Sequence, residues 1–260
     1  MDALRIGASG MMAQQRNVEV VANNLANMNT SGFQRRRSEF QDLIYKNSAR
    51  PDGFGSRAGA QVPGGIQTGK GVDLMSVYRV TEQGSLKATD NTFDLAIQGK
   101  GYFQIQLPNG ETGYTRDGTF QIDSGGALVT HDGFPVLPGV QVPADAVDVT
   151  INATGEVLVK QDGTATPSNI GTIQIAIFPN EGGLHAEGNN LFTATDASGA
   201  AASVIPKQSG SGSVLQGFVE SSNVNAVEEI AEMIRAQRAY DMNSKVIQTA
   251  DQMMAPSTGR

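Results

Sequence analysis

Few residues in this chain have the types and spacing that catalysis or metal binding requires. The only histidines are His131 and His185, and cysteine is absent, so disulfides and thiolate chemistry are excluded. No G-x-S-x-G motif accompanies the histidines, and the D-x-[DN]-x-[DN]-G spacing of a calcium loop does not occur. The two Gly-Lys-Gly triplets, at residues 69–71 and 99–101, lack the longer spacing of a phosphate-binding loop. We therefore expect no enzyme, no cofactor or metal site and no small-molecule substrate.

Charge and hydropathy argue against two further functional classes, nucleic-acid-binding and membrane-spanning proteins. The 260 residues carry a formal net charge of -7, which argues against a nucleic-acid partner, because phosphate binding needs a basic surface. The one basic run, Arg35-Arg36-Arg37, is short and is expected in a solvated or interface loop. Glycine is abundant at 31 residues and aromatic residues make up only 6%, a composition typical of a turn-rich β-protein. No apolar stretch approaches the roughly 18 residues of a membrane span.

The elements that must organise such a protein are two long amphipathic helices, predicted at residues 3–29 and 224–254. Apolar side chains recur every seven positions in each, which is coiled-coil spacing and requires a partner helix. Asparagine and glutamine are also dense in both helices, and either register-fixing hydrogen bonds or plain solvation would explain them. The predicted interface residues are Leu4, Met11, Val18, Val21, Leu25 and Met28 in the first helix, and Ile230, Met233, Tyr240, Ile247 and Met254 in the second.

A lone pair of such helices should be only marginally stable. Burying roughly eight medium apolar side chains gains about 12–24 kcal/mol gross. Ordering about 30 residues costs on the order of 30–60 kcal/mol of backbone entropy, which helix hydrogen bonds offset only in part. The helical ends are therefore expected to order on other molecules. A helical hairpin packed on its own domain is the alternative.

Between the helices the sequence predicts antiparallel β-structure. Alternating runs at residues 94–97, 102–107, 119–122, 147–151 and 171–178 are separated by Asn-Gly and Asp-Gly hairpin signals. The apolar segment at residues 33–45 is either an extended arm or a brief helix. Residues 46–71 are rich in Gly and Pro without periodicity, as in a long loop. Gly32 is expected to cap the first helix, and Asn223 or Asn225 the start of the second.

The predicted fold class is α+β, with terminal helices that form a coiled coil, extended arms and a central, mainly antiparallel β-domain. Residues 1–33 and 217–260 are expected to form the helical domain. Residues 34–71 and 205–216 are the connecting arms, with the Gly/Pro-rich insertion at 46–71. Residues 72–204 are the outer β-domain.

Several segments resemble the bacterial flagellar axial proteins, the family of rod, hook and hook-associated subunits. ANNLANMNTSGF at residues 22–33 resembles the N-terminal signature, and residues 217–254 resemble the C-terminal one. DLAIQGKGYFQI at 94–105 and YTRDGTFQIDSGGALVTHDGFPVL at 114–137 resemble the β-domain core. The length, and the insertion after SEFQDLIYKN, are most similar to those of the distal rod subunit of the basal body. The alternatives are a proximal rod or hook-type protein, and a secreted oligomeric adhesin or enzyme.

The resemblance implies a structural subunit that stacks into a helical tube. The terminal helices would form the inner layer, the arms the middle layer, and the β-domain would face outward. The tube would transmit torque and form the export channel. Implied partners are other copies of the chain, the proximal rod and hook proteins, the peptidoglycan-layer and outer-membrane rings and the flagellar export apparatus. The expected location is the basal body, from periplasm to outer membrane, after export without a cleaved signal peptide.

The resemblance implies that the insertion at residues 46–71 is missing from hook-type proteins, which form a bending hook, whereas rod proteins form a stiff rod. We expect this segment to be ordered in the polymer and to stiffen it, as segments that order on binding do. A mobile surface loop is the alternative. The residues expected to contribute are Arg50, Pro51, Phe54, Val62, Pro63 and Ile66.

Overall fold

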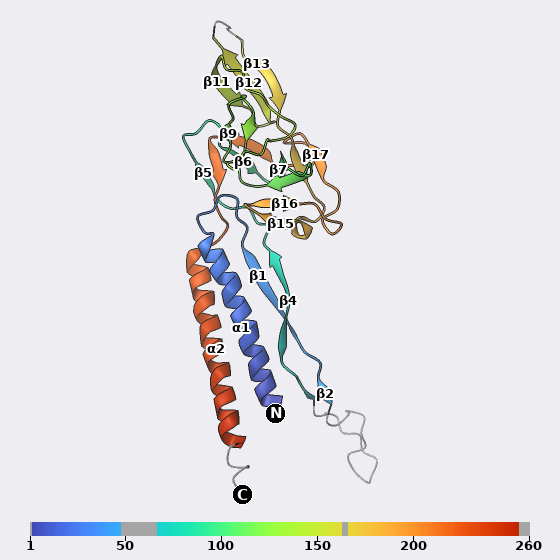
Figure 1. Ribbon diagram of the computed structural model, residues 1–260, viewed down its shortest axis with the longest axis vertical. Coiled ribbons are helices and arrows are strands. Elements are labelled where there is room, and N and C mark those ends of the chain that lie inside the picture. Colours follow the sequence, from blue (N-terminus) through green and yellow to red (C-terminus); the bar gives the residue numbers. More distant parts are fainter. Residues whose placement is uncertain (1, 48–66, 163–165, 255–260) are drawn as a thin grey trace. The chain divides into compact units, whose positions relative to one another are not determined.

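The computed structural model describes residues 2–47, 67–162 and 166–254, and the chain divides into two compact units (Figure 1). The first unit comprises residues 1–25, 36–78 and 225–260. The second comprises residues 26–35 and 79–224. An N-terminal helix, a C-terminal helix and a central antiparallel β-domain together confirm the α+β class.

The first unit contains both long helices and a two-stranded ribbon. α1 spans Asp2–Ala26 and α2 spans Ala226–Met254. β1 (Arg36–Asp42) pairs with β4 (Val72–Arg79), so the segment after the first helix is a strand rather than a helix. β2 (Lys46–Asn47) pairs with β3 (Gln67–Thr68), in the segment of the chain that connects β1 to β4.

Asn225 caps the start of α2, which confirms one of the two predicted caps. Its Oδ1 accepts a hydrogen bond from the Val227 amide at 3.1 Å, which satisfies one of the unpaired N–H groups of the first turn. Asn223 acts elsewhere, within the second unit. Its Oδ1 accepts from the Arg35 amide at 2.7 Å, and its Nδ2 donates to the Val80 and Glu82 carbonyls. One carboxamide thereby joins three backbone segments.

The predicted cap at Gly32 is wrong, because α1 already ends at Ala26. Gly32 does adopt the left-handed conformation, with φ of +68°. The reason is a close approach between segments of the second unit: a Cβ atom at this position would lie 2.7 Å from the Asp117 backbone nitrogen. Its amide donates to the Glu220 carbonyl at 2.8 Å, so the glycine ties residues 26–35 to the β-structure.

The second unit is built from antiparallel β-structure. In the described residues its largest sheet has the strand order β15-β16-β8-β7-β14-β17, and a smaller one has the order β11-β12-β13. Further pairs are β9–β10, β6–β18 and β5–β19. The bounds are β5 (Leu86–Ala88), β6 (Leu95–Gln98), β7 (Tyr102–Gln106), β8 (Thr112–Thr115), β9 (Gln121–Ile122), β10 (Leu128–Val129), β11 (Ala146–Ile151), β12 (Glu156–Gln161), β13 (Ser168–Thr172), β14 (Ile175–Ile177), β15 (His185–Gly188), β16 (Leu191–Thr193), β17 (Ala202–Val204), β18 (Ser213–Gln216) and β19 (Phe218–Glu220), with a 3-10 turn at Glu181–Gly183.

Two sequence signals mislead within this unit. The run at residues 171–178 is not one strand, because β13 ends at Thr172 and β14 begins at Ile175 in a different sheet. The Asp117-Gly118 pair does not close a hairpin between β8 and β9, which belong to different sheets. A Cβ at Gly118 would collide with the Leu95 carbonyl, so this glycine allows a close backbone approach. Asn109-Gly110, in contrast, does lie in the turn of the β7–β8 hairpin.

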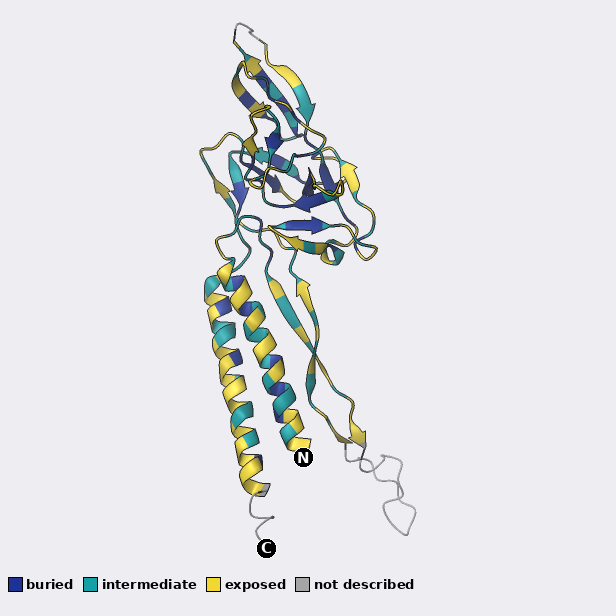
Figure 2. Ribbon diagram, viewed as in Figure 1, coloured by how far each residue is buried: buried dark blue, intermediate teal, exposed yellow. Residues whose placement is uncertain are grey.

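The core of the second unit lies on both faces of β7. Phe103 and Ile105 point into the larger apolar cluster, where Phe103 meets Phe120 edge-to-face with ring centroids 5.1 Å apart. Tyr102 points into a second cluster with Tyr114 and Phe178. Burial on both faces explains why the successive residues Tyr102 and Phe103 are both aromatic and why the first four residues of β7 are all buried. Figure 2 shows buried residues gathered in these sheets, whereas much of both long helices is exposed.

Candidate functional site

The described residues contain no group of three or more His, Asp or Glu side chains that could hold a metal ion. Among them, neither α1 nor α2 is long and apolar enough to cross a membrane. The features that distinguish this structure are instead the contacts and the exposed side chains of the first unit.

Small residues make the contact between α1 and α2. A Cβ added to Gly7 would lie 2.8 Å from Ile247 Cγ1, and one added to Gly10 would lie 2.7 Å from Asn243 Nδ2. Neither position can hold a larger side chain without displacing its neighbour, so the two helices approach closely. Three further small residues on the helices, Ala13, Ala236 and Ala250, are buried as well.

A buried polar cluster, which we call the clamp, joins α1, α2 and β1 through Asn24, Glu229, Arg36 and Arg37. Asn24 Nδ2 donates to the Arg36 carbonyl at 2.8 Å and to Glu229 Oε2 at 3.0 Å, and Asn24 Oδ1 accepts from the Arg36 amide at 2.8 Å. Arg37 forms an ion pair with Glu229 Oε1 at 3.1 Å. Asn24 and Glu229 are both fully buried. Such a network fixes the register of three segments, because each partner left alone would be an unsatisfied buried group.

The clamp shows how the face of α2 toward α1 is built. Glu229 and Asn243 both contact α1, and they belong to a seven-residue series with Ala236 and Ala250. The residues of α2 that face α1 are thus spaced by seven, but they are small and polar and are not the apolar series that the sequence predicted. Among the asparagines and glutamines that are dense in the two helices, Asn24 fixes the register of α1 against α2, whereas Asn23 is exposed.

Most of the predicted apolar interface residues lie beside this face rather than on it. Val21 is buried. A groove of about 450 Å³ between the helices is lined by Val18, Tyr240, Gln15, Gln237 and Asp241. Met254 ends α2, and its side chain lies outside the described part. Leu4, Met11, Val18, Leu25, Met233 and Ile247 are half-buried, whereas Met28, Ile230 and Tyr240 are exposed.

Further exposed apolar side chains were not singled out by the seven-residue spacing. On the helices they are Ile6, Met12, Val227, Ile234, Met242, Val246 and Met253. Val227 at 77%, Met253 at 71% and Met12 at 67% exposure are the extremes. A simple count of all apolar residues on each helix would have found them, because they surround the helix instead of following one stripe.

The β1–β4 ribbon adds a second exposed surface to the first unit. One side of the ribbon contacts α1: Ser38 Oγ donates to Asn17 Oδ1 at 2.6 Å, and the Val72 amide donates to Ser9 Oγ at 3.3 Å. On β4 the side chains of Met75, Val77 and Tyr78 are exposed. A two-stranded ribbon is marginally stable alone, so an exposed apolar face marks it as an element that needs a partner.

The predicted insertion residues Arg50, Pro51, Phe54, Val62, Pro63 and Ile66 lie outside the described residues. Their role remains a prediction.

The second unit holds a buried structural cluster of titratable groups with raised pKa values, formed by Glu220 and Tyr102 around Arg116. Arg116 and Glu220 are both buried, with 3.5 Å between the guanidinium and the carboxylate. Burial raises the pKa of Glu220, and the Arg116 charge opposes that rise. Burial also raises the pKa of Tyr102 to about 12, and the Tyr102 hydroxyl donates to Glu181. The Arg116 guanidinium lies over the Tyr102 ring, so this cluster holds β7 and β19 in place.

Three protein-family profiles match this chain, each over a different part of it. The family profile described as "Flagella basal body rod protein" matches residues 4–34. "Flagellar hook protein FlgE/F/G D1 domain" matches residues 96–159, and "Flagellar basal body rod FlgEFG protein C-terminal" matches residues 215–256. The matches therefore cover α1, much of the β-structure and α2.

Whole-length relatives agree with the profiles. "Flagellar basal-body rod protein FlgG" of Caulobacter vibrioides is 56% identical over 98% of this chain and 97% of its own length. The protein of the same name from Agrobacterium fabrum is 48% identical over 97% of each chain. That from Bacillus subtilis is 38% identical over 97% of this chain and 96% of its own. The chain belongs to the FlgG family of flagellar basal-body rod proteins, and it is a structural subunit of the distal rod rather than an enzyme.

Proposed function

We propose that this subunit polymerises into a stiff helical tube whose inner layer is a coiled coil of α1 and α2 from many copies. The observation that carries the proposal is the distribution of side chains on the two helices. Small residues such as Gly7, Gly10 and Ala236 make the contact within one chain, which leaves large apolar residues exposed. Fully burying each such side chain is worth about 1.5–3 kcal/mol, and only other molecules can supply that burial.

Two different exposed surfaces favour an open polymer over a closed oligomer. The helix pair presents residues such as Ile230 and Tyr240, and the ribbon presents Met75 and Val77. When one patch of a subunit binds a different patch on the next, the contact repeats head-to-tail and builds a helical filament. The predicted helical interface residues, from Leu4 to Met254, would then contact neighbouring copies.

The layers of the tube follow the predicted order of helical domain, arms and β-domain. α1 and α2 form the inner wall around the export channel, the ribbon of β1 and β4 with the insertion forms the middle layer, and the second unit, which includes β18 and β19, faces outward. A tube held by three layers transmits torque as a drive shaft. The Gly/Pro-rich insertion at residues 46–71 stiffens it by lying across the next subunit, so that neighbours cannot slide as they must in a bend.

The partners of this drive shaft are the proximal rod on one side and the hook protein on the other. The peptidoglycan-layer and outer-membrane rings surround it, and the flagellar export apparatus delivers its subunits. This places it across the periplasm as far as the outer membrane. The support is membership of the rod family.

Electron microscopy of polymers of the full chain tests this function. Straight, hollow tubes with a helical inner wall are the expected result. Closed rings, or filaments whose wall contains no helices, would refute it.

A further inference from the structure

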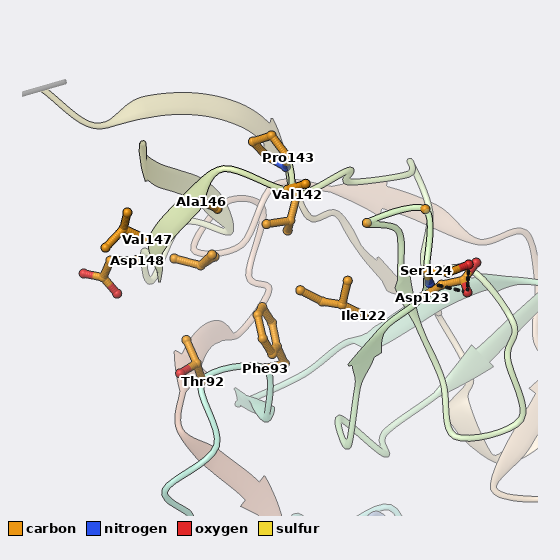
Figure 3. Close-up of a pocket in the computed structure, with 14 residues that line it drawn as sticks. Thr92, Phe93, Ile122, Asp123, Ser124, Val142, Pro143, Ala146, Val147 and Asp148 are labelled. Carbon is orange, nitrogen blue, oxygen red and sulfur yellow. Dashed lines mark hydrogen bonds between the residues drawn. The ribbon is translucent and has the colours of Figure 1, made fainter. Parts of the chain in front are cut away.

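A groove in the second unit lies between β9, β11 and neighbouring loops (Figure 3). Its volume is about 470 Å³, and apolar side chains of Phe93, Ile122, Val142 and Val147 line it. Val147 is 67% exposed and Ile122 is 37% exposed, although both stand in strands of a well-packed β-unit. Apolar side chains gathered in an open groove are typical of a surface that another molecule covers.

The two strands beside the groove are both edge strands. In the described residues β9 pairs only with β10, and β11 pairs only with β12. Gln216 caps the far part of the β11 edge, because its Nε2 donates to the Val149 carbonyl and its Oε1 accepts from the Ile151 amide, both at 2.9 Å. Of residues 146–148, which line the groove, the Ala146 amide donates to the Pro143 carbonyl at 3.1 Å, whereas no side chain caps Val147 and Asp148 in the described residues. The uncapped part of an edge accepts an extended segment by backbone pairing.

The charge of the groove selects a cationic occupant. Asp123 and Asp148 lie at opposite ends of it, with the apolar side chains between them (Figure 3). No Lys or Arg is among its lining residues. The whole second unit has 7 basic and 15 acidic residues, a net charge of -8. Complementary charge steers an encounter and fixes its register.

The chain itself carries a segment of the required chemistry. Residues 46–71 contain four basic residues and one acidic residue, a net charge of +3, together with the apolar side chains of Phe54, Val62 and Ile66. The β2–β3 pair holds the two ends of the segment together. We propose that the insertion of one copy binds the Asp123–Asp148 groove of a second copy, with its apolar side chains over Ile122 and Val147 and its arginines at the two aspartates. This rests on the proposed tube.

Cysteine cross-linking tests the contact directly, because the chain has no cysteine of its own. Phe54→Cys and Val147→Cys are introduced together, the full chain is polymerised and oxidised, and the products are separated without reductant. A disulfide needs Cα atoms within about 7 Å, so a ladder of covalent multimers is expected. The matched control pairs Phe54→Cys with Cys at Asp196, an exposed residue outside the groove. Bonds within single chains, or an equal ladder from the control, would overturn the proposal.

Charge reversal tests whether the contact between the insertion and the groove stiffens the tube. Asp123→Lys/Asp148→Lys should leave tubes that form but bend, with a several-fold shorter persistence length in micrographs. Arg50→Glu/Arg57→Glu in the same chain should restore the straight form, while Asp132→Lys/Asp196→Lys should have no effect. Equally stiff tubes from the groove variant, or curved tubes that the second pair does not rescue, would refute the groove contact and leave the tube itself standing. Failure of the unaltered chain to form tubes would instead refute the proposed function.

Discussion

Replacing Asn24 by leucine should weaken polymerisation strongly, because Asn24 is the centre of the clamp. The substitution keeps the size of the side chain but removes all three of its hydrogen bonds. Two of these bonds reach the backbone of Arg36, which is exposed, so water replaces part of their energy and each is worth about 0.5–1.5 kcal/mol. The third reaches the buried carboxylate of Glu229 and is worth about 1.5–3 kcal/mol. The expected cost is about 2.5–6 kcal/mol per subunit.

That free energy converts directly into a concentration. If the helices order only on assembly, the cost falls on polymerisation and raises the critical subunit concentration by roughly two to four orders of magnitude. If they are already ordered in the monomer, the cost appears there as a loss of helix signal. Sedimentation of polymer across a dilution series measures the first quantity, and circular dichroism of the monomer measures the second. Asn23→Leu, at the exposed neighbouring position, is the control. A critical concentration within twofold of the unaltered chain, with unchanged helix signal, would refute the reasoning about the clamp.

Four further expectations follow from the same structure. Leu25→Asp or Ile247→Asp places an unpaired charge in an apolar surface, so polymer should disappear from sedimentation assays while the β-unit stays folded; normal polymers would contradict the coiled-coil proposal. Limited proteolysis of a proven monomer should remove both ends and spare a core near residues 79–224, which includes β18 and β19, and equal resistance throughout would count against it. Deleting about 15 residues within 53–69 should leave tubes that assemble but curve in micrographs; straight tubes would favour a mobile loop. Burial raises the pKa of Glu220, so the stabilisation that its protonated form gives is full at low pH and is lost as the pH rises through the raised pKa. The free energy of unfolding in urea should therefore increase more from pH 7.5 to pH 5 in the unaltered chain than in Glu220→Gln.

The sequence allowed the long helices to be predicted because their signals are local. Seven-residue apolar spacing located α1 and α2 to within a few residues, and Asn225 marked the start of α2 through ordinary capping chemistry. The hairpin at Asn109-Gly110 was likewise predictable, since the turn needs only its own residues. Gly32 shows the limit of this reasoning: its left-handed conformation was predicted, but the cause lies in a close approach to Asp117 that no local pattern reveals.

The clamp could not be predicted for the same reason. Asn24 and Glu229 are 205 positions apart, and Glu229 taken alone is one of two acidic residues suited to a helix dipole. Only the fold brings the carboxylate against Asn24 and Arg37 and buries it. The exposed ribbon was equally hidden, because the exposure of Met75 and Val77 depends on which side of the ribbon α1 covers.

The two glycines in the helix contact also determine when the helix forms. Gly7 and Gly10 each cost a helix about 1 kcal/mol relative to alanine, and the asparagines of α1 add smaller penalties. An isolated N-terminal segment with this sequence is therefore a poor helix in water, and its apolar side chains are not aligned on one face while it is alone. The close contact with α2 recovers that cost only after the partner is in place. The residues that permit tight packing therefore also make the isolated segment a weak helix, so the exposed apolar surface of α1 exists only where a packed partner helix holds it in shape.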